Sequence, residues 1–472
     1  MKKLSFLLVL SAFMVMVSCS DSNPVLTIEG GKITGVQTPT NGVIAYKGIP
    51  FAAPPVGDLR WREPQPVVPW EGVKVADAYG DAAEQITWDP ESFYGREWRA
   101  SGSVPFSEDC LYLNVWTPAA GKTDRKLPVA MWIHGGGYRE GFAFEPEMDG
   151  GEYWASHGVI LVSVTYRLGV MGFFSHPLLS AESPHGVSGN YGLFDQLAAI
   201  KWIFNNIEQF GGDPGNITIF GQSAGAGSVQ ALCASPLARD LISHAISMSG
   251  GGLSDARPGT LLDTAQMANK RMMDYFEKTT LEEMRALSFE ELLKMSNDYS
   301  TATHKRVMWG PVIDDYLSKG TFTTEARAGE IADIPYMIGF CANDMNDMTN
   351  AVGDFCALRA KQSSKPAFAY MFARPLPGDD HGAFHSSDLW YVFHSLSHSW
   401  RPFTEGDKDL SNRIVDFYTN FAKYGDPNGK EPGVWVPYSA ANPGFMVFNV
   451  DGDKASCTMT DTPEYKGPAS LR

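Results

Sequence analysis

The chain has 472 residues, of which 44% are hydrophobic, so it can bury a large core, and nothing in its composition indicates disorder or a fibrous repeat. It carries 38 basic and 54 acidic residues, a net charge of −16, and no segment concentrates Lys and Arg. Nucleic acid is therefore not an expected partner, and we interpret the acidity as a contribution to solubility.

The N-terminus has the pattern of a secretory signal. Two lysines precede an apolar run over residues 4–17, which ends in Val17-Ser18-Cys19. The run is shorter than the roughly 20 residues that span a bilayer. Its ending resembles a bacterial lipobox, in which the cysteine is lipidated and becomes the new N-terminus. We therefore expect a signal over residues 1–19 and an exported periplasmic or cell-envelope lipoprotein, whose membrane contact is a lipid on Cys19. Plain secretion with cleavage nearby is the alternative.

The first half of the mature chain contains two regions with different composition and hydrophobic pattern. Residues 30–116 are rich in Gly, Pro and β-formers, as expected of antiparallel edge strands and loops. Between residues 128 and 250, short apolar runs alternate with a helical pattern around residues 193–207. Runs that are apolar throughout predict strands covered on both faces, at 129–133, 159–165, 217–220 and 245–248. This alternation predicts a parallel sheet with crossover helices.

The second half returns to the same pattern after an interruption. Residues 261–295 are helix-prone and punctuated by charges, so we expect a helical insertion over the sheet at about 255–330. Strand runs resume at 334–340, 367–374 and 445–450, with a helix around 412–421. Residues 20–472 are therefore predicted to form a single α/β domain. It has a mostly parallel central sheet, an antiparallel edge, helices on both faces and a reduced helical cap.

Gly221-Gln222-Ser223-Ala224-Gly225 follows one of these strands and precedes a helix-compatible segment. This is the nucleophile-elbow pattern of an α/β-hydrolase fold, in the context that it requires. Glycines flank the serine because the turn is too tight for side chains, and the helix N-terminus favours negative charge. Ser223 is the candidate nucleophile. The alternative interpretation is a turn of small residues without a function.

His134-Gly135-Gly136-Gly137 directly follows the strand at 129–133, where an oxyanion-hole loop is expected. Consecutive glycines let backbone N–H groups approach a substrate oxygen, so Gly136 and Gly137 are the candidate donors, with the N–H of Ala224 as a third. Each such donor is typically worth about 10²- to 10³-fold in rate. A glycine-rich turn with no ligand is the alternative.

The serine needs a base, and in α/β-hydrolases the acid and then the histidine follow the serine along the chain. Composition does not choose among the six histidines after Ser223, which are His244, His304, His381, His385, His394 and His398.

A series of ordered motifs resembles the type-B carboxylesterases, the family that includes para-nitrobenzyl esterases and cholinesterases. The likeness extends over nearly all of the mature chain. Besides the glycine loop and the elbow, the motifs are Gly48-Ile49-Pro50-Phe51-Ala52, Gly57-Asp58-Leu59-Arg60-Trp61, Ser107-Glu108-Asp109-Cys110-Leu111-Tyr112-Leu113-Asn114, Gly189-Asn190-Tyr191-Gly192-Leu193-Phe194-Asp195-Gln196 and Phe210-Gly211-Gly212-Asp213-Pro214.

This resemblance implies a base and an acid. The family's catalytic histidine lies in a Gly-x-x-His segment that leads into Tyr-Val-Phe, which implies His385, with His381 and His394 as fallbacks. The family's acid is usually a Glu in a segment that follows a strand, and Asp344 occupies the corresponding place. Asp347 is the alternative. Either carboxylate can hold the histidine tautomer and stabilise the imidazolium.

Two departures from the family pattern carry expectations. The family often has a cysteine that pairs with the one at Cys110, but Ala83 stands at the matching position, so Cys110 is expected to be a free, buried thiol. Only 41 positions separate Asp344 from His385, fewer than is usual in the family. Cap helices are therefore expected to be missing, which predicts a wide, shallow entrance that admits bulky esters.

The sequence thus predicts a serine carboxylesterase that works through an acyl-enzyme on Ser223 and needs no metal or organic cofactor. We expect short or aromatic acyl groups, because a broad entrance lacks the enclosed channel that a fatty acyl chain would use. One alternative is a non-catalytic binding protein, like the neuroligin-like relatives on this fold. Another keeps the triad but cleaves an amide, a carbamate or a long-chain lipid ester. The natural substrate and the oligomeric state are not predicted.

Overall fold

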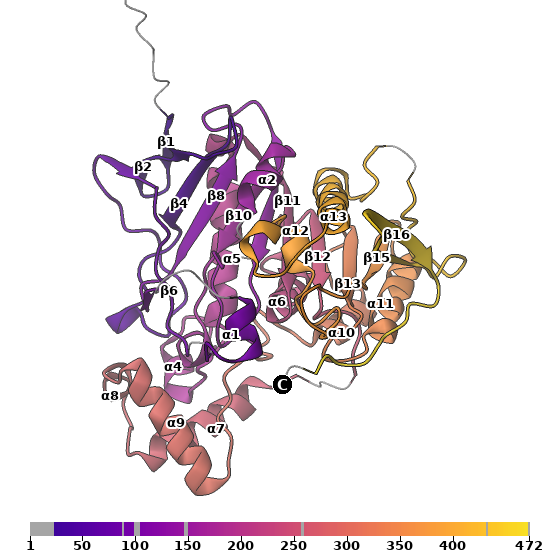
Figure 1. Ribbon diagram of the computed structural model, residues 1–472. Helices are drawn as coiled ribbons and strands as arrows, with labels where there is room; N and C mark the ends of the chain where they lie inside the picture. The colour runs from indigo at the N-terminus through magenta and orange to yellow at the C-terminus, as the bar shows by residue number, and fades with distance from the viewer. Residues whose placement is uncertain are drawn as a thin grey trace, which may run out of the picture.

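The computed structural model describes residues 23–86, 89–98, 104–145, 150–255, 259–430 and 433–470. An 11-stranded sheet runs through the whole molecule (Figure 1). In spatial order its strands are β16 (Lys454–Thr460), β15 (Phe445–Asp451), β14 (Ala367–Phe372), β13 (Tyr336–Cys341), β12 (His244–Met248), β11 (Gly212–Gln222), β9 (Leu127–Ile133), β10 (Ile160–Val164), β8 (Tyr112–Thr117), β4 (Ile44–Pro50) and β3 (Val36–Gln37).

The middle of the sheet is parallel and both edges are antiparallel. From β10 through β9, β11, β12, β13 and β14 to β15, each neighbouring pair is parallel. At one edge β8, β4 and β3 pair antiparallel, and at the other β16 pairs antiparallel with β15. The predicted fold class is therefore confirmed, and each strand predicted after residue 128 lies in this sheet. β16 was not predicted.

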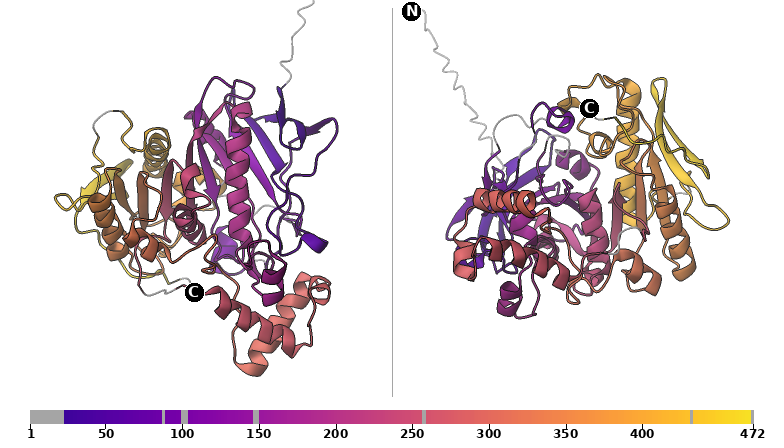
Figure 2. Two further views of the ribbon diagram at one scale, coloured as in Figure 1. Left: turned by 180° about the vertical axis from the view of Figure 1, so that it is seen from behind. Right: turned by 90° about the horizontal axis from the view of Figure 1, so that it is seen from below.

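Helices cover both faces, which explains why the central strands lack an alternating pattern. β10, β13 and β14 are buried at every residue. α5 (Tyr191–Asn206), α6 (Ala224–Ala234) and α11 (Thr349–Gln362) pack on one face, and α2 (Gly151–Ser156) and α13 (Glu405–Tyr424) pack on the other (Figure 2). α5 is the predicted crossover helix, and α13 contains the helix predicted around residues 412–421.

The helical insertion carries α7 (Leu262–Tyr275), α8 (Leu281–Arg285), α9 (Phe289–Thr303) and α10 (Phe322–Ala328). α7 to α9 extend below the sheet in Figure 1, beside α4 (Pro177–Glu182), and α9 contacts α3 (Gly169–Phe173), which follows β10. They share a second hydrophobic cluster with the main body, which includes Trp61, Phe174, Met272, Met284 and Leu292. Capping boxes begin α8 and α9.

The first hundred described residues supply smaller elements around one edge. β1 (Val25–Ile28), β2 (Gly31–Thr34) and β5 (Val73–Val75) form a three-stranded sheet, and β6 (Ala82–Ala83) pairs with β7 (Phe106–Ser107). The short helices α1 (Phe93–Glu97) and α12 (Leu389–Val392) come from opposite ends of the chain. The antiparallel strands expected within residues 30–116 are represented by β4 and β8.

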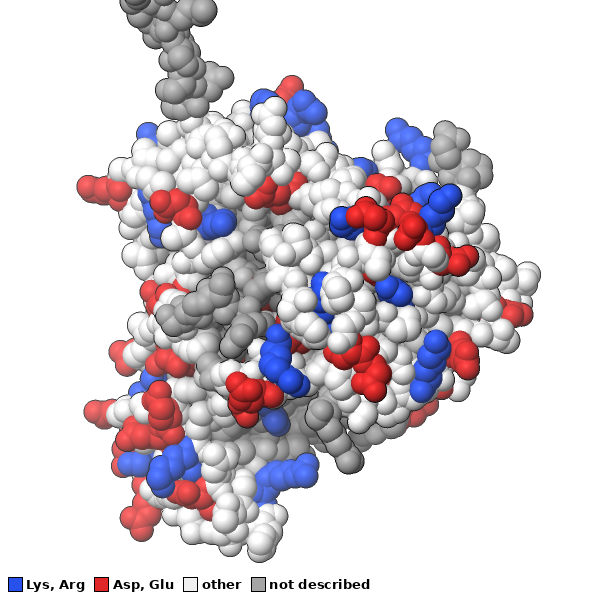
Figure 3. All heavy atoms as spheres, viewed as in Figure 1, with Lys and Arg blue, Asp and Glu red and all other residues white. Residues whose placement is uncertain are grey.

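Five cysteines lie among the described residues, and all five are free. Cys110 is buried and lines one small cavity together with Ala83, as expected for an unpaired thiol at that place. The predicted signal at residues 1–19 lies outside the described residues. None of the described helices combines the length and the hydrophobicity needed to cross a bilayer. On the face shown in Figure 3, basic side chains are scattered among acidic ones.

Candidate active site

Ser223 sits in a strained turn between β11 and α6. Its backbone has φ 58° and ψ −120°, which is unusual for a residue with a side chain. The turn is tight on both sides, because a Cβ at Gly221 would lie 2.6 Å from the carbonyl carbon of Gly225, and one at Gly225 would lie 2.1 Å from the carbonyl oxygen of Ile133. The two glycines are therefore required by the close approach of three backbone segments.

The glycine loop lies directly against this turn. A Cβ at Gly135 would lie 2.8 Å from the carbonyl oxygen of Gln222, and Gly136 and Gly137 adopt φ values of 90° and 64°. Ala224 is the first residue of α6, so its N–H has no acceptor within the helix. Backbone donors from two segments thus lie at the N-terminus of an 11-residue helix, where negative charge is stabilised.

His134, at the start of the glycine loop, is completely buried and supports the loop. Burial lowers its pKa to about 4, so the imidazole is neutral at pH 7. Its ring stacks on Tyr166 at 4.4 Å between centroids, and the Tyr166 hydroxyl donates to the His134 carbonyl at 2.8 Å. These contacts connect the loop to the end of β10.

His385 and Asp344 form a buried pair. Nδ1 of His385 lies 2.7 Å from Oδ1 of Asp344, and their side chains are 8% and 0% exposed. Burial alone would raise the pKa of Asp344, but hydrogen bonds from His385, Ser249 and the Cys341 N–H outweigh it and hold the pKa below its usual value. The carboxylate is therefore ionised and orients the imidazole so that Nε2 faces away from it.

The alternative residues lie elsewhere. The ring of His381 packs against Phe93 at 4.7 Å between centroids, and Nδ1 of His394 lies 2.9 Å from the Ser411 hydroxyl. Asp347 is exposed and accepts a hydrogen bond from the N–H of Thr349 at the start of α11. Neither these three residues nor the remaining histidines after Ser223 line the cavity at Ser223.

Ser223 and His385 share a cavity of about 260 Å³. It is lined by the glycine loop, Gln222, Tyr94, Trp98, His134, Glu140, Gly141, Glu145, Met345, Ser386 and Leu389. Nε2 of His385 lies 3.2 Å from the nitrogen of the Gln222 side-chain amide. Among the described residues, the Ser223 hydroxyl makes no hydrogen bond to His385 Nε2. Catalytic hydrogen bonds are often long without substrate and shorten in the complex. The width of the entrance stays a prediction.

Two residues of this region were not singled out from the sequence. Gln222 immediately precedes Ser223, and its side chain occupies the space beside Nε2 of His385. Asp388 is completely buried three residues after His385, and burial together with the charge of Asp344 raises its pKa to about 7. Two signals could have identified them: Gln222 is adjacent to the nucleophile, and Asp388 is a carboxylate three positions beyond the histidine.

No group of three or more His, Cys, Asp or Glu side chains in the described part of the chain is arranged to hold a metal ion. Ser223 instead lies beside backbone N–H groups and shares its cavity with an imidazole that is paired with a buried carboxylate. This set is suited to nucleophilic acyl transfer, in which a hydroxyl attacks a carbonyl carbon and fixed donors stabilise the oxygen.

The mixed sheet, the strand–turn–helix around Ser223 and the adjacent glycine loop define an α/β-hydrolase fold. The model of the carboxylesterase family matches residues 22–355 and 345–464. The chain therefore belongs to the carboxylesterase family, and the resemblance to type-B carboxylesterases is confirmed.

Individual relatives agree with this family. The chain is 37% identical to fumonisin B1 esterase of Sphingopyxis macrogoltabida over 95% of its length and 80% of that protein. It is 33% identical to para-nitrobenzyl esterase of Bacillus subtilis, covering 94% and 87% of the two chains. Among solved structures, a PNB esterase superposes with a TM-score of 0.78 at 28% identity, over 93% of this chain and 97% of the other. The chain is a carboxylic-ester hydrolase that acts on small-molecule esters.

Proposed function

We propose that this hydrolase works through an acyl-enzyme on Ser223, with His385 as the base, Asp344 as the orienting acid, and the N–H groups of Gly136, Gly137 and Ala224 as the oxyanion donors. The observation that carries the proposal is the buried His385–Asp344 pair, which opens into the same cavity as a strained serine and a glycine loop.

The cycle has two halves. His385 Nε2 takes the proton of Ser223 as its Oγ bonds to the ester carbonyl carbon, and then gives that proton to the leaving alcohol as the C–O bond breaks. Water then attacks the acyl-enzyme, with His385 again accepting a proton and returning it to Ser223 as the acid leaves. The ionised Asp344 stabilises the imidazolium in both halves, consistent with the lowered pKa of this carboxyl.

We propose short-chain or aromatic acyl groups as the substrate class. A cavity of about 260 Å³ beside Ser223 supports this, because a short or aromatic acyl group fits within it. The names of the similar proteins refer to several different esters, so they do not select one for this chain.

The test begins with p-nitrophenyl acetate and a fluorophosphonate probe. The wild-type protein is expected to turn over the ester and to accept one label, and Ser223→Ala is expected to lose the label and about 10⁴- to 10⁶-fold of kcat. Two results would contradict the proposal: wild-type protein that the fluorophosphonate does not label, or full turnover by Ser223→Ala. A non-catalytic binding protein would give neither label nor turnover.

A second measurement tests the substrate class. Hydrolysis of acyl chains from two to sixteen carbons, with methyl cinnamate and a matched anilide alongside, gives a profile of kcat/KM. Short or aromatic acyl esters are expected to be the best substrates. A maximum at long chains, or faster cleavage of the anilide, would replace this proposal by a lipase or an amidase.

We also propose export as a lipoprotein, which the sequence around Cys19 supports. Expressed in a Gram-negative host, the full chain is expected to incorporate labelled palmitate and to partition into detergent. Cys19→Ser should lose both properties while keeping esterase activity. Cleaved, unlabelled and fully aqueous wild-type protein would favour plain secretion.

A further inference from the structure

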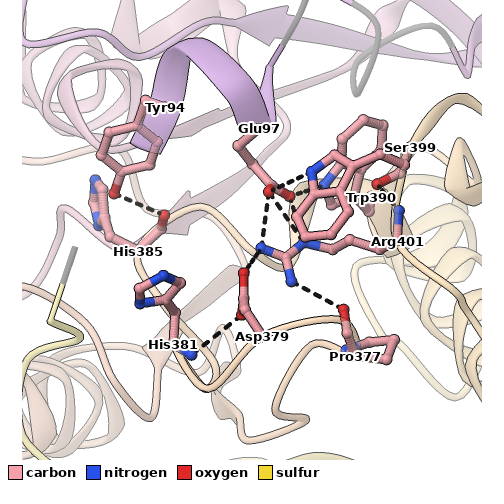
Figure 4. A network of polar contacts seen from close by, with 10 residues as sticks. Tyr94, Glu97, Pro377, Asp379, His381, His385, Trp390, Ser399 and Arg401 are labelled. Atoms are coloured by element: carbon pink, nitrogen blue, oxygen red, sulfur yellow. Dashed lines mark hydrogen bonds and ion pairs between the residues drawn. The ribbon is translucent and has the colours of Figure 1, made fainter. Parts of the chain in front are cut away.

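A buried ion pair joins α1 to the segment that follows His385, and both segments contribute residues to the cavity wall. Glu97, at the end of α1, and Arg401 have side chains that are only 1% and 0% exposed. Nε of Arg401 lies 2.8 Å and 3.0 Å from the two Glu97 oxygens, and Nη2 lies 2.8 Å from one of them (Figure 4). Removing Arg401 would leave the Glu97 carboxylate buried without its charged partner, so the pair strongly constrains the segments that carry it.

Arg401 also holds the segment that contains His385. Its Nη1 donates to the carbonyl of Pro377 at 3.0 Å, and Nη2 donates to Asp379 at 2.7 Å. The residues before and after the His385 loop are thus connected by one guanidinium, as Figure 4 shows. The Trp390 indole N–H, from the same segment, donates to Glu97 at 2.9 Å.

α1 and the residue that caps its C-terminal end carry two aromatic side chains of the cavity wall. Tyr94 and Trp98 both line the cavity, and their rings are nearly parallel, 6.2 Å apart. The Tyr94 hydroxyl donates to the backbone carbonyl of His385 at 3.2 Å (Figure 4). Trp98 also packs against Trp390, with ring centroids 5.4 Å apart.

A helix of five residues is too short to be stable by itself, so its position depends on tertiary contacts. The contact that fixes the end of α1 is the Glu97–Arg401 pair, whose members are 304 positions apart. Together with the Tyr94 hydrogen bond and the ring contact of Trp98, this pair holds the helix against the His385 segment.

We propose that Glu97 and Arg401 are positioning residues for substrate selection, because they hold Tyr94 and Trp98 as an aromatic wall against which the ring of an aromatic ester packs. This rests on the proposed esterase site at Ser223, and it names the substrate feature that the site recognises. Flat aromatic groups gain from offset or edge-to-face packing on such rings, beyond what an alkyl chain of equal size gains.

The experiment compares esters matched in carbon number. Methyl 3-phenylpropanoate against methyl nonanoate tests the acyl side, and benzyl acetate against heptyl acetate tests the alcohol side. The wild-type protein is expected to prefer the aromatic member of at least one pair. Trp98→Leu should lower that preference about 3- to 10-fold, mainly through KM, because an aromatic contact is lost.

The positioning role of the Glu97–Arg401 pair is tested by Glu97→Gln and by the conservative Arg401→Lys. Glu97→Gln should lower the aromatic preference in the same direction as Trp98→Leu, and Arg401→Lys should keep part of it. The matched control is Asp195→Asn, which removes the buried partner of another buried arginine, Arg167, away from α1. It is expected to lower Tm but to leave the preference within about twofold.

The outcomes separate this inference from the proposed function. A preference unchanged in Trp98→Leu would overturn the aromatic wall. A lower Tm with unchanged preference in both Glu97→Gln and Arg401→Lys would reduce the pair to a structural role. If Glu97→Gln does not fold, Arg401→Lys decides the second point. A wild-type protein that hydrolyses neither the ester pairs nor p-nitrophenyl acetate would instead refute the proposed site.

Discussion

The two halves of the candidate site are built in different ways. The half that carries Ser223 consists of two short contiguous motifs whose backbones touch, so that a Cβ at Gly225 would meet the end of β9. The half that carries His385 is an irregular segment held by remote partners, such as Asp344 and the Glu97–Arg401 pair. Local backbone geometry therefore fixes the nucleophile, whereas buried charges fix the base.

The largest effect is expected from filling the close approach in the first half. Gly225→Ala places a Cβ about 2.1 Å from the Ile133 carbonyl oxygen, which requires β9 and α6 to separate. We expect a loss of more than about 4 kcal/mol in the free energy of unfolding, and no measurable esterase activity.

Urea unfolding and p-nitrophenyl acetate turnover measure this prediction. Gly215→Ala is the matched control, because Gly215 lies in β11, the strand that leads into the Ser223 turn, is exposed and has no backbone atom near the added Cβ. It should change stability by less than about 0.5 kcal/mol. Normal stability of Gly225→Ala would mean that the turn is not as constrained as its contacts indicate.

In the second half the largest effect is expected from the acid. Asp344→Asn keeps the size of the side chain but removes the charge that stabilises the His385 imidazolium, so kcat should fall about 10²- to 10⁴-fold. Asp347→Asn should retain the wild-type kcat, since Asp347 is exposed and its carboxylate accepts from the N–H of Thr349 at the start of α11. If Asp347→Asn shows the larger loss, the two carboxylates exchange roles.

The same contrast explains what the sequence could and could not predict. The elbow and the glycine loop are recognisable because their chemistry requires particular small residues in consecutive positions. The parallel strands are recognisable because burial on both faces excludes polar residues from runs such as β10. β16 was missed because it is a half-exposed edge strand with mixed polarity, which becomes a strand through its pairing with β15.

His385 was selected by resemblance to a family rather than by its own surroundings in the sequence. The side chains that hold it are chosen by tertiary contacts, and their spacing along the chain carries no signal. Glu97 and Arg401 are 304 positions apart. From the sequence alone, each would be expected to be an ordinary charged residue on the surface. Asp388 likewise has a raised pKa only because folding removes it from water near Asp344.

Asp388 gives a smaller, pH-dependent effect in the second half. Because burial and the Asp344 charge raise its pKa to about 7, the native protein keeps a proton that the unfolded chain releases above about pH 4. The unfolded state then binds fewer protons than the native state, so stability falls as the pH rises from about 4 to about 7. Asp388→Asn has no proton to lose, so its stability relative to wild type should rise by about 2 to 4 kcal/mol over that window.

Urea unfolding at pH 4.5, 5.5 and 7.5 measures this difference. Asp124→Asn, on the exposed turn before β9, is the matched control for the exchange of Asp for Asn. A constant difference for Asp388→Asn would show that Asp388 is already ionised in the native protein, so that a partner must compensate its charge.

The smallest effect is expected from the helix cap of α13, just beyond the His385 segment. This effect tests whether α13 or Arg401 anchors that segment. Thr404 begins α13 with a capping box, in which its hydroxyl accepts from the Asp407 N–H at 3.3 Å and its N–H donates to the Asp407 carboxylate at 2.8 Å. Thr404→Ala should cost about 1 kcal/mol of stability. It should leave kcat and the aromatic preference unchanged, since Arg401 already fixes the segment three residues earlier.

Ser288→Ala, which removes the equivalent cap from α9, is the matched control. If Thr404→Ala alone lowers kcat, the base is positioned by α13 and not by the buried arginine.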